Sequence, residues 1–168
     1  RIISMTGLIE STINTVRRIS SELRPGVLDD LGLVAAIEWQ AQQFQRRTGL
    51  KLHWETDLDN AEVSRDGATA VFRIFQEVLT NILRHSRAKN IYVKLFEIDQ
   101  SLELEVTDDG RGITDDEQQN TRSLGLLGMK ERALLVEGEV SIKGAQGKGT
   151  RVLVRIPLSQ GVESETVA

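Results

Sequence analysis

Residues 91–112 read IYVKLFEIDQSLELEVTDDGRG and decide the fold, because two alternating segments lead straight into an acidic, glycine-rich turn. Apolar and polar residues alternate in 91–95 and again in 102–106, which predicts two strands. The short polar link at 99–101 joins them as a hairpin. The apolar positions, which we expect to face the core, are Ile91, Val93, Leu95, Leu102, Leu104 and Val106.

The segments on either side supply helices and further strands. Upstream, the sequence predicts a helix that Asp29 or Asp30 caps and that ends at Gly49, with Leu33, Ile37, Ala41 and Phe44 on one face. A strand at 50–55 follows, with Leu50, Leu52 and Trp54 buried, and then a polar loop at 57–67. The next element is a long helix whose buried residues are Ala68, Val71, Phe72, Phe75, Val78, Leu79 and Ile82. Downstream, it predicts a polar stretch at 113–123, a short helix at 126–136 ended by Gly138, and strands at 140–142 and 152–156 joined by a glycine-rich turn at 144–149. Mostly antiparallel strands with a few helices predict an α+β fold with one sheet face covered by helices.

An apolar heptad seam precedes this domain. Its members are Ile2, Met5, Ile9, Thr12, Val16, Ile19 and Leu23. Such a seam packs either on a partner helix or on the rest of its own chain, and the pattern favours neither. Pro25 and Gly26 end this helix. We expect residues 1–26 to be the end of a helix from a longer protein, followed by one domain at 27–158 and a polar tail at 159–168.

Composition excludes several classes of function. The 168 residues carry 21 Lys and Arg against 25 Asp and Glu, a net charge of -4, which argues against nucleic acid or an anionic membrane surface as the main partner. Without cysteine, disulfide scaffolds, cysteine-rich zinc modules and thiol catalysis are excluded. No stretch approaches the ~20 apolar residues of a membrane span, and the N-terminus is not a signal peptide. We expect a soluble cytoplasmic domain.

The long helix carries a polar stripe opposite its apolar face. Glu77, Asn81 and His85 follow at intervals of four residues, with Arg84 beside them. In an α-helix this spacing places neighbours about 6 Å apart. Such a stripe is most commonly a solvated helix face, but a carboxylate and an amide oxygen on one face also suit Mg²⁺.

Three glycine motifs follow, each of them ambiguous alone. Asp108-Asp109-Gly110-Arg111-Gly112 is either a common turn or a close approach of backbone to ligand. Ser123-Leu-Gly125-Leu-Leu-Gly128-Met129-Lys130 opens a helix, where free N–H groups form a plausible phosphate cradle. Gly147-Lys148-Gly149-Thr150 is either a tight turn or a source of backbone donors and a hydroxyl for a phosphate. The order and spacing of these motifs carry more weight than any one of them.

Taken together, Glu77-x-x-x-Asn81 and the three glycine motifs resemble the N box and glycine boxes of the GHKL ATPases, the superfamily of gyrase, Hsp90, MutL and sensor histidine kinases. Three details resemble the histidine kinases paired with NarL/LuxR-type response regulators. They are Leu23-Arg24-Pro25 with Leu28-x-x-Leu31-Gly32-Leu33, Asn81-Ile-Leu-Arg84-His85-Ser86-x-Ala88, and Gly128-Met129-Lys130-Glu131-Arg132. The resemblance runs from about residue 17 to 157.

The resemblance implies a Bergerat-type two-layer ATP-binding sandwich and assigns roles to its residues. It implies that Asn81 ligates Mg²⁺, that Asp108 reads the adenine amino group, and that Glu77 orders Mg²⁺ or a water. Glu77 and Asn81 would be the catalytic residues. It implies ATP contacts for Asn81, Arg84, His85, Asp108, Gly110, Gly112, Ile113, Gly125, Leu126, Gly128, Met129 and Thr150. Arg84 replaces a frequent Lys, and residues 113–124 would form a lid over ATP.

The family's phosphoacceptor histidine has no counterpart here. The only histidines are His53, in a predicted strand, and His85, in the N box. The resemblance therefore implies an acceptor on a dimerisation helix upstream of Arg1, a homodimer in the whole protein, and relay to a response regulator. This chain would not phosphorylate itself. No clear phenylalanine box precedes the expected lid.

Other functions remain open at this point. A hydrolytic ATPase of the gyrase or chaperone type would use Glu77 to activate water. A non-catalytic module would only dimerise through the heptad helix, although the intact glycine motifs count against it. A serine kinase of the anti-sigma type shares the pocket but normally lacks the preceding helix.

Overall fold

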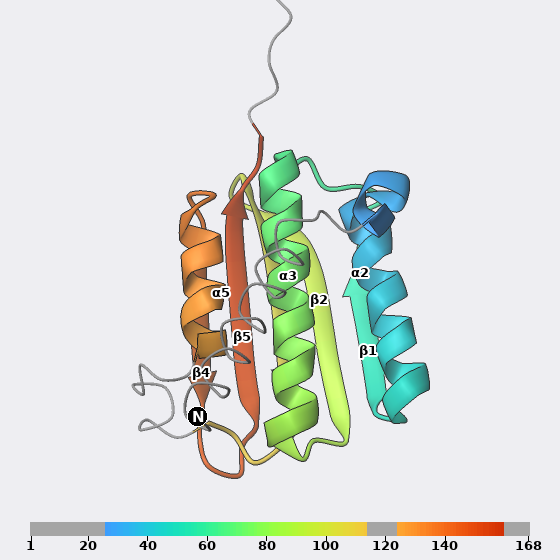
Figure 1. Cartoon of the computed structure of the whole chain (residues 1–168), viewed down its shortest axis with the longest axis vertical. Coiled ribbons are helices and arrows are strands. Elements are labelled where there is room, and N and C mark those ends of the chain that lie inside the picture. The colour runs from blue at the N-terminus through green and yellow to red at the C-terminus, as the bar shows by residue number, and fades with distance from the viewer. Residues whose placement is uncertain (1–25, 114–123, 160–168) are drawn as a thin grey trace, which may run out of the picture.

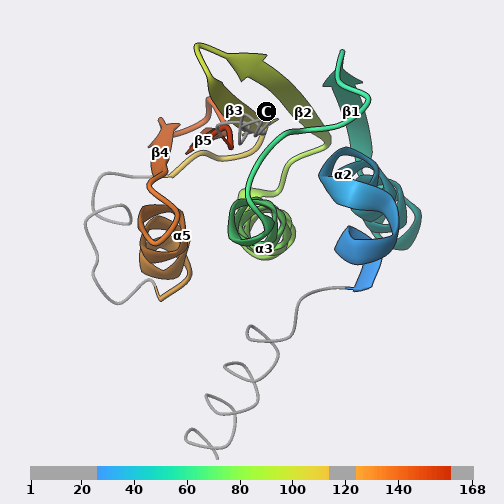
Figure 2. The same cartoon turned by 90° about the horizontal axis from the view of Figure 1, so that it is seen from above.

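The chain folds into two layers, as the computed structural model in Figure 1 shows for residues 26–113 and 124–159, the residues that it describes. The elements are α2 (Gly26–Thr48), β1 (Lys51–Thr56), α3 (Arg65–Asn81), the π-helical turn η1 (Ile82–Ser86), β2 (Asn90–Ile98), β3 (Ser101–Asp108), α5 (Leu124–Leu134), β4 (Glu139–Gly144) and β5 (Thr150–Pro157). Helices α2, α3 and α5 lie side by side on one face of the sheet (Figure 2). The predicted α+β sandwich is confirmed. The predicted N-terminal helix, almost all of the predicted lid and most of the polar tail fall outside the described residues.

The sheet is mixed and mostly antiparallel, as predicted. Its strand order is β1-β2-β3-β5-β4, and only β1 and β2 are parallel. A parallel pair needs a crossover, which α3 supplies. The predicted hairpin pairs Ile98 with Ser101, and both turn residues, Asp99 and Gln100, have positive φ angles of 49° and 59°. Two such residues form the tight turn whose twist suits antiparallel strands.

The core lies between the sheet and the helices. Its sheet side contains every inward position predicted for β2, β3 and β5, and its helix side contains the predicted apolar faces of α2 and α3. The buried strand residues are Ile91, Val93, Leu95, Leu102, Leu104, Val106, Val152, Val154 and Ile156. By contrast, Leu50, Leu52 and Trp54, which we expected to be buried, are only half-buried, because β1 is at the edge of the sheet and begins after Leu50.

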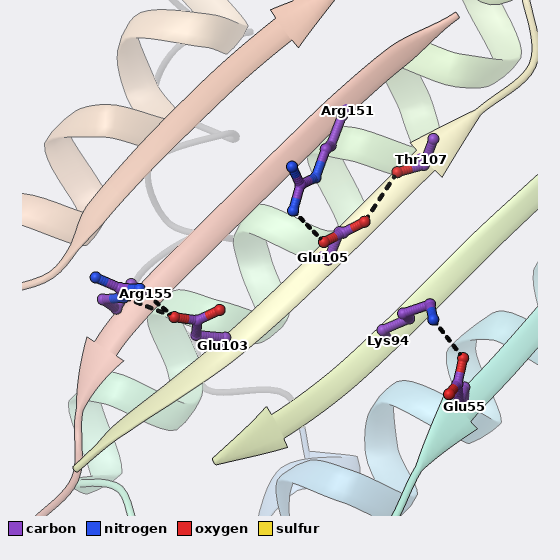
Figure 3. Close-up of polar contacts among 7 residues, drawn as sticks. All are labelled: Glu55, Lys94, Glu103, Glu105, Thr107, Arg151 and Arg155. Atoms are coloured by element: carbon purple, nitrogen blue, oxygen red, sulfur yellow. Dashed lines mark hydrogen bonds and ion pairs between the residues drawn. The ribbon is translucent and has the colours of Figure 1, made fainter. Parts of the chain in front are cut away.

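Charged pairs cover the opposite face of the sheet (Figure 3). Glu55 pairs with Lys94 at 2.7 Å, Glu105 with Arg151 at 2.5 Å, and Glu103 with Arg155. His53 stacks on Tyr92 there, with ring centroids 4.8 Å apart. Water screens exposed pairs of this kind, so they contribute little and burial on the helical face dominates stability. None of the helices in 26–113 and 124–159 is both long and apolar enough to cross a membrane.

Three helix starts differ from their predictions. Helix α5 begins at Leu124, two residues before the predicted start at 126. Helix α2 begins at Gly26 instead of being capped by Asp29 or Asp30, and Gly32 (φ 75°, ψ 174°) interrupts it. Asp29 lies in the first turn, where the helix dipole favours a carboxylate. Helix α3 begins at Arg65, within the predicted loop, because the Ser64 hydroxyl accepts the Gly67 N–H at 3.0 Å and caps the helix.

Two helix ends also differ. The long helix changes at Ile82 into the π turn η1, which the α-helical spacing did not predict. Helix α5 ends at Leu134, before the predicted end at 136, and Glu137 instead of Gly138 takes the left-handed conformation (φ 58°). Gly138 is needed for packing, since a Cβ there would lie 2.2 Å from Ile156 Cδ1.

Candidate functional site

A groove of about 760 Å³ lies at one end of the helical layer, between α3, α5 and the ends of three strands. This volume is within the range of small-molecule sites. Its lining residues are Glu77, Val78, Thr80, Asn81, Ile82, Arg84, His85, Ser86, Val106, Asp108, Arg111, Gly112, Ile113, Gly125, Leu126, Met129, Arg132, Ile142, Thr150 and Val152. An apolar floor with a few convergent polar groups is the usual build of a ligand pocket.

The helix side of the groove carries the predicted polar stripe. Glu77 and Asn81 are half-buried, one turn apart on α3, and both line the groove. Arg84 and His85 line it from η1, where both are exposed. Because hydrogen bonds in a π turn skip one residue more than in an α-helix, His85 does not continue the stripe with regular spacing. Of the two alternatives for the stripe, the structure therefore favours a groove wall over a solvated helix face.

The π turn is attached to the glycine-rich turn after β3. The Ser86 carbonyl accepts the Arg111 N–H at 2.7 Å, and the His85 carbonyl accepts Arg111 Nε–H at 2.8 Å. Gly110 packs so closely that a Cβ there would lie 2.2 Å from the Ser86 carbonyl oxygen. Gly110 thus brings two backbone segments together and does not itself line the groove.

Asp108 is the buried carboxylate of the site. It is 3% exposed, lines the groove from the end of β3, and accepts the Gly110 N–H at 2.8 Å through Oδ1. Burial raises the pKa of its carboxyl above the ordinary value, although a hydrogen bond from Gly110 opposes the shift. The like charge of Asp109 raises the pKa further, and hydrogen bonds from Thr150 lower it. A carboxylate held this way can accept a hydrogen bond from a ligand amino group.

Asp109 has a structural role instead. Its Oδ1 accepts the N–H groups of Lys89 and Asn90 at 2.7 and 2.9 Å, and its Oδ2 accepts Asn90 Nδ2–H at 2.6 Å. These hydrogen bonds, chiefly those of Asn90, lower the pKa of the exposed Asp109 carboxyl. The residue fixes the start of β2 relative to the end of β3.

The turn before β5 does not offer backbone donors to a phosphate, which corrects one sequence-based alternative. The N–H groups of Gly147 and Gly149 donate to the carbonyls of Arg111 and Gly110 at 2.6 and 3.0 Å. The Lys148 N–H donates to Ala145 within the turn. Thr150 lines the groove, as expected, and the turn holds the glycine-rich segment after β3 in place.

Helix α5 closes the side of the groove that faces α3. Gly125 lies against Glu77, since a Cβ on Gly125 would be 2.3 Å from Glu77 Oε1. Leu126 and the fully buried Met129 supply apolar surface. Gly128, in contrast, lies outside the lining and packs under the Arg132 guanidinium.

Most residues proposed from the sequence therefore meet in one groove. Those that line it are Glu77, Asn81, Arg84, His85, Asp108, Gly112, Ile113, Gly125, Leu126, Met129 and Thr150, whereas Gly110 and Gly128 do not line it but contact residues that do. Sequence reasoning missed two arginines, Arg111 and Arg132, although both stand inside the quoted motifs. It also missed the apolar floor of Val106, Ile142 and Val152, whose inward direction the strand alternation already indicated.

The charges are arranged asymmetrically. Asp108 lies where β3 ends, while Glu77 and Asn81 lie toward α5. In 26–113 and 124–159 no three His, Cys, Asp or Glu side chains are placed to hold a metal ion by themselves. A cation bound near Glu77 and Asn81 would also need oxygen atoms from a bound molecule and from water, which is how Mg²⁺ is usually held beside phosphates.

Comparison with known proteins identifies relatives of this arrangement. The profile of the histidine kinase-, DNA gyrase B-, and HSP90-like ATPase family matches residues 66–160. The histidine kinase domain of the blue-light activated histidine kinase from Erythrobacter litoralis EL346 is 26% identical, with a TM-score of 0.68 over 95% of this chain and 85% of that domain.

Two further histidine kinase structures are also similar to this chain. A longer structure of the same Erythrobacter litoralis EL346 kinase is 28% identical, with a TM-score of 0.66 over 77% of this chain; the match spans 42% of that kinase's length. The mycobacterial sensor histidine kinase MprB is 26% identical, with a TM-score of 0.59 over 74% of this chain and 93% of that structure.

Proposed function

Since the chain belongs to the histidine kinase-, DNA gyrase B- and HSP90-like ATPase family, we propose that it is the catalytic, ATP-binding part of a two-component sensor histidine kinase. The observation that carries the proposal is the meeting of Asp108, Asn81 and Gly125 in one groove, although they lie far apart in the sequence. Relatives at 26–28% identity are histidine kinases, which favours this branch of the family.

The adenine base occupies the end of the groove at Asp108. The carboxylate accepts a hydrogen bond from the exocyclic amino group, and Thr150 lies beside it across the pair of strands β3 and β5. Val106, Ile142 and Val152 provide the apolar surface for the ring. A buried acceptor that loses its partner is penalised strongly, so this contact discriminates adenine from bases that lack the amino group.

The triphosphate lies along α3 toward α5. Arg84 and His85 approach it from η1, and α5 faces it at Gly125, where Glu77 Oε1 lies in the space that a side chain would take. Asn81 and Glu77 offer an amide oxygen and a carboxylate one turn apart, a donor set that fits Mg²⁺. When bound, Mg²⁺ supplies neutralisation of charge on the phosphate oxygens.

The reaction is transfer of the γ-phosphoryl group to a histidine nitrogen. The nitrogen forms a bond to phosphorus while the bond from phosphorus to the bridging oxygen of ADP breaks, and ADP leaves. This chain contributes positioning and electrostatic stabilisation, which is most of what phosphoryl transfer requires. Glu77 positions ligands of this reaction and is not assigned as a general base.

We propose that the acceptor histidine belongs to a dimerisation helix of the whole protein that the 168 residues do not include. His53 is an unsuitable acceptor because its ring stacks on Tyr92 on the charged face of the sheet, away from the helical layer. His85 lines the groove itself. We further propose a cytoplasmic homodimer in the whole protein, with relay to a response regulator of the NarL/LuxR kind.

Calorimetric titration with Mg-ATP, together with an assay of phosphate release, tests the function. A histidine kinase part predicts binding with little turnover by this chain alone. Sustained hydrolysis would favour a hydrolytic ATPase that uses Glu77 to activate water, and a chain that binds no adenine nucleotide would refute both. In the whole protein, radiolabelled γ-phosphate should appear on histidine as an acid-labile, base-stable adduct.

A further inference from the structure

Arg132 is a groove residue to which the proposed function has given no role. It lines the groove from α5, where it lies seven residues after Gly125 and four after Gly128. Residues at these spacings share one face of an α-helix. Arg132 therefore stands on the same face of α5 as the residue that contacts Glu77.

The Arg132 side chain folds back over Gly128. A Cβ on Gly128 would lie 3.3 and 3.4 Å from the two terminal nitrogens, Nη2 and Nη1, so the guanidinium covers the bare backbone there. Long side chains in helices point toward the helix N-terminus, which is the end of α5 that meets the groove. The absence of a side chain at Gly128 thus gives the guanidinium room to lie along the groove wall.

None of the ion pairs between residues of 26–113 and 124–159 involves Arg132. Its Nε is buried and has no hydrogen-bond partner within the part of the chain that the structure describes. Another cation lies within electrostatic reach: burial, and next the positive charge of Arg132, lower the pKa of Arg73. Two guanidinium groups near one another, one with an unused buried donor, favour an anion between or beside them.

The place of Arg132 along α3 indicates which anion this residue would bind. The base end of the groove is fixed by the contact of Ser86 with Arg111, at the C-terminal end of the long helix. Arg73 lies eight residues before Asn81, about 12 Å toward the other end at 1.5 Å per residue. Arg132 lies seven residues beyond Gly125, which contacts Glu77, and its charge lowers the pKa of Arg73. Arg132 is therefore on the far side of Asn81 from Asp108.

We infer that Arg132 binds the terminal phosphate of the nucleotide, so that it makes the groove prefer ATP to ADP. The inference rests on the proposed function and deepens it. The Arg132 guanidinium can donate hydrogen bonds to two phosphate oxygens at once, a geometry that lysine cannot reproduce. The charge also lies where negative charge is redistributed as the γ-phosphoryl group leaves ADP.

Calorimetric titration of the full chain with ATP, ADP and adenosine tests this inference in three variants. Arg132→Gln keeps most of the side-chain length but removes the charge, Arg132→Lys restores the charge alone, and Lys130→Gln removes one charge from an exposed position of the same helix. We expect Arg132→Gln to weaken ATP about tenfold or more, ADP about threefold or less, and adenosine not at all. Arg132→Lys should recover part of the ATP affinity, and Lys130→Gln should bind as the wild type does.

Equal losses for ATP, ADP and adenosine in Arg132→Gln would overturn the inference, since they would indicate a role in holding α5 alone. An equal loss of ATP affinity in Lys130→Gln would also overturn it, because general charge would then explain the effect. If Arg132→Gln does not fold, Arg132→Lys decides alone: its ratio of ATP to ADP affinity should fall relative to the wild type, and an unchanged ratio would refute the inference. A wild-type chain that binds none of the three ligands refutes the proposed function itself.

Discussion

Asp108 and Asp109 are consecutive in the chain, yet their carboxylates serve opposite sides of the same turn. Asp108 is 3% exposed and faces the groove, whereas Asp109 is exposed and accepts three hydrogen bonds from Lys89 and Asn90. Strand alternation puts Asp108, the last residue of β3, on the same face as the buried Val106, whereas Asp109 already lies beyond the strand. One carboxylate is therefore available to a ligand, and its neighbour holds the strands in place.

Replacing the groove carboxylate should separate base recognition from phosphate binding. We expect Asp108→Asn to weaken ATP about tenfold or more, because the amide presents a donor to the adenine amino group, while inorganic triphosphate loses little. Competition titrations with both ligands measure the two losses. Asp109→Asn is the matched control and should leave ATP affinity unchanged while lowering the free energy of unfolding by about 1 kcal/mol. Equal losses of ATP and triphosphate in Asp108→Asn would contradict adenine reading.

The raised pKa of Asp108 predicts a specific dependence of stability on pH. Its ionised form is disfavoured in the folded chain, so the penalty is absent below the ordinary pKa of 3.8 and complete above the raised folded pKa. The stability of the wild type relative to Asp108→Asn should therefore fall as the pH rises through that window. Urea unfolding of both chains without nucleotide, between about pH 4 and pH 8, measures the difference. A stability difference that is constant with pH would show that burial does not shift the pKa of Asp108.

The amide of Asn81 should matter only for the metal-bound nucleotide. We expect Asn81→Ala to weaken Mg-ATP about tenfold or more, because the metal loses a protein oxygen ligand at the phosphates. Calorimetry with adenosine provides the control, since adenosine carries no phosphate and should bind equally well to both chains. An unchanged affinity for Mg-ATP would remove Asn81 from the metal site.

Two glycines of the site should respond to alanine in opposite ways. At Gly110 the new Cβ would lie 2.2 Å from a backbone oxygen of Ser86, which cannot move away, so we expect a loss of about 3 kcal/mol or more in unfolding free energy. At Gly125 it would meet Glu77 Oε1, the end of a flexible side chain, so stability should stay within about 1 kcal/mol of the wild type.

For Mg-ATP binding, unlike stability, the substitution at Gly125 should have a clear effect of its own. Gly125→Ala displaces the Glu77 carboxylate and should weaken Mg-ATP several-fold in a chain that is still folded. Thermal unfolding and calorimetry on the same samples test this pair. A folded, stable Gly110→Ala chain, or a Gly125→Ala chain with full Mg-ATP affinity, would contradict the contacts described.

The sequence was sufficient for those parts of the fold that depend on periodicity. Alternation located β2, β3 and β5 and their inward residues, and helical spacing located the buried face of α3. It was insufficient where a single local hydrogen bond decides a boundary, as at Ser64, or where tertiary contacts override local preference, as at Gly138. Motif order located most of the groove, but the side on which Arg132 lies depends on how α5 packs against α3, which no local pattern encodes.

The π turn η1 has a consequence for how this chain tolerates length changes. Deleting one residue between 82 and 86 would convert η1 into an ordinary helical turn, so circular dichroism should register almost no change. The register of everything after it would shift by one position, however, and the Ser86 carbonyl would no longer reach the Arg111 amide. A single-codon deletion here should therefore leave the helix content intact and uncouple the Asp108 end of the groove from the Asn81 end.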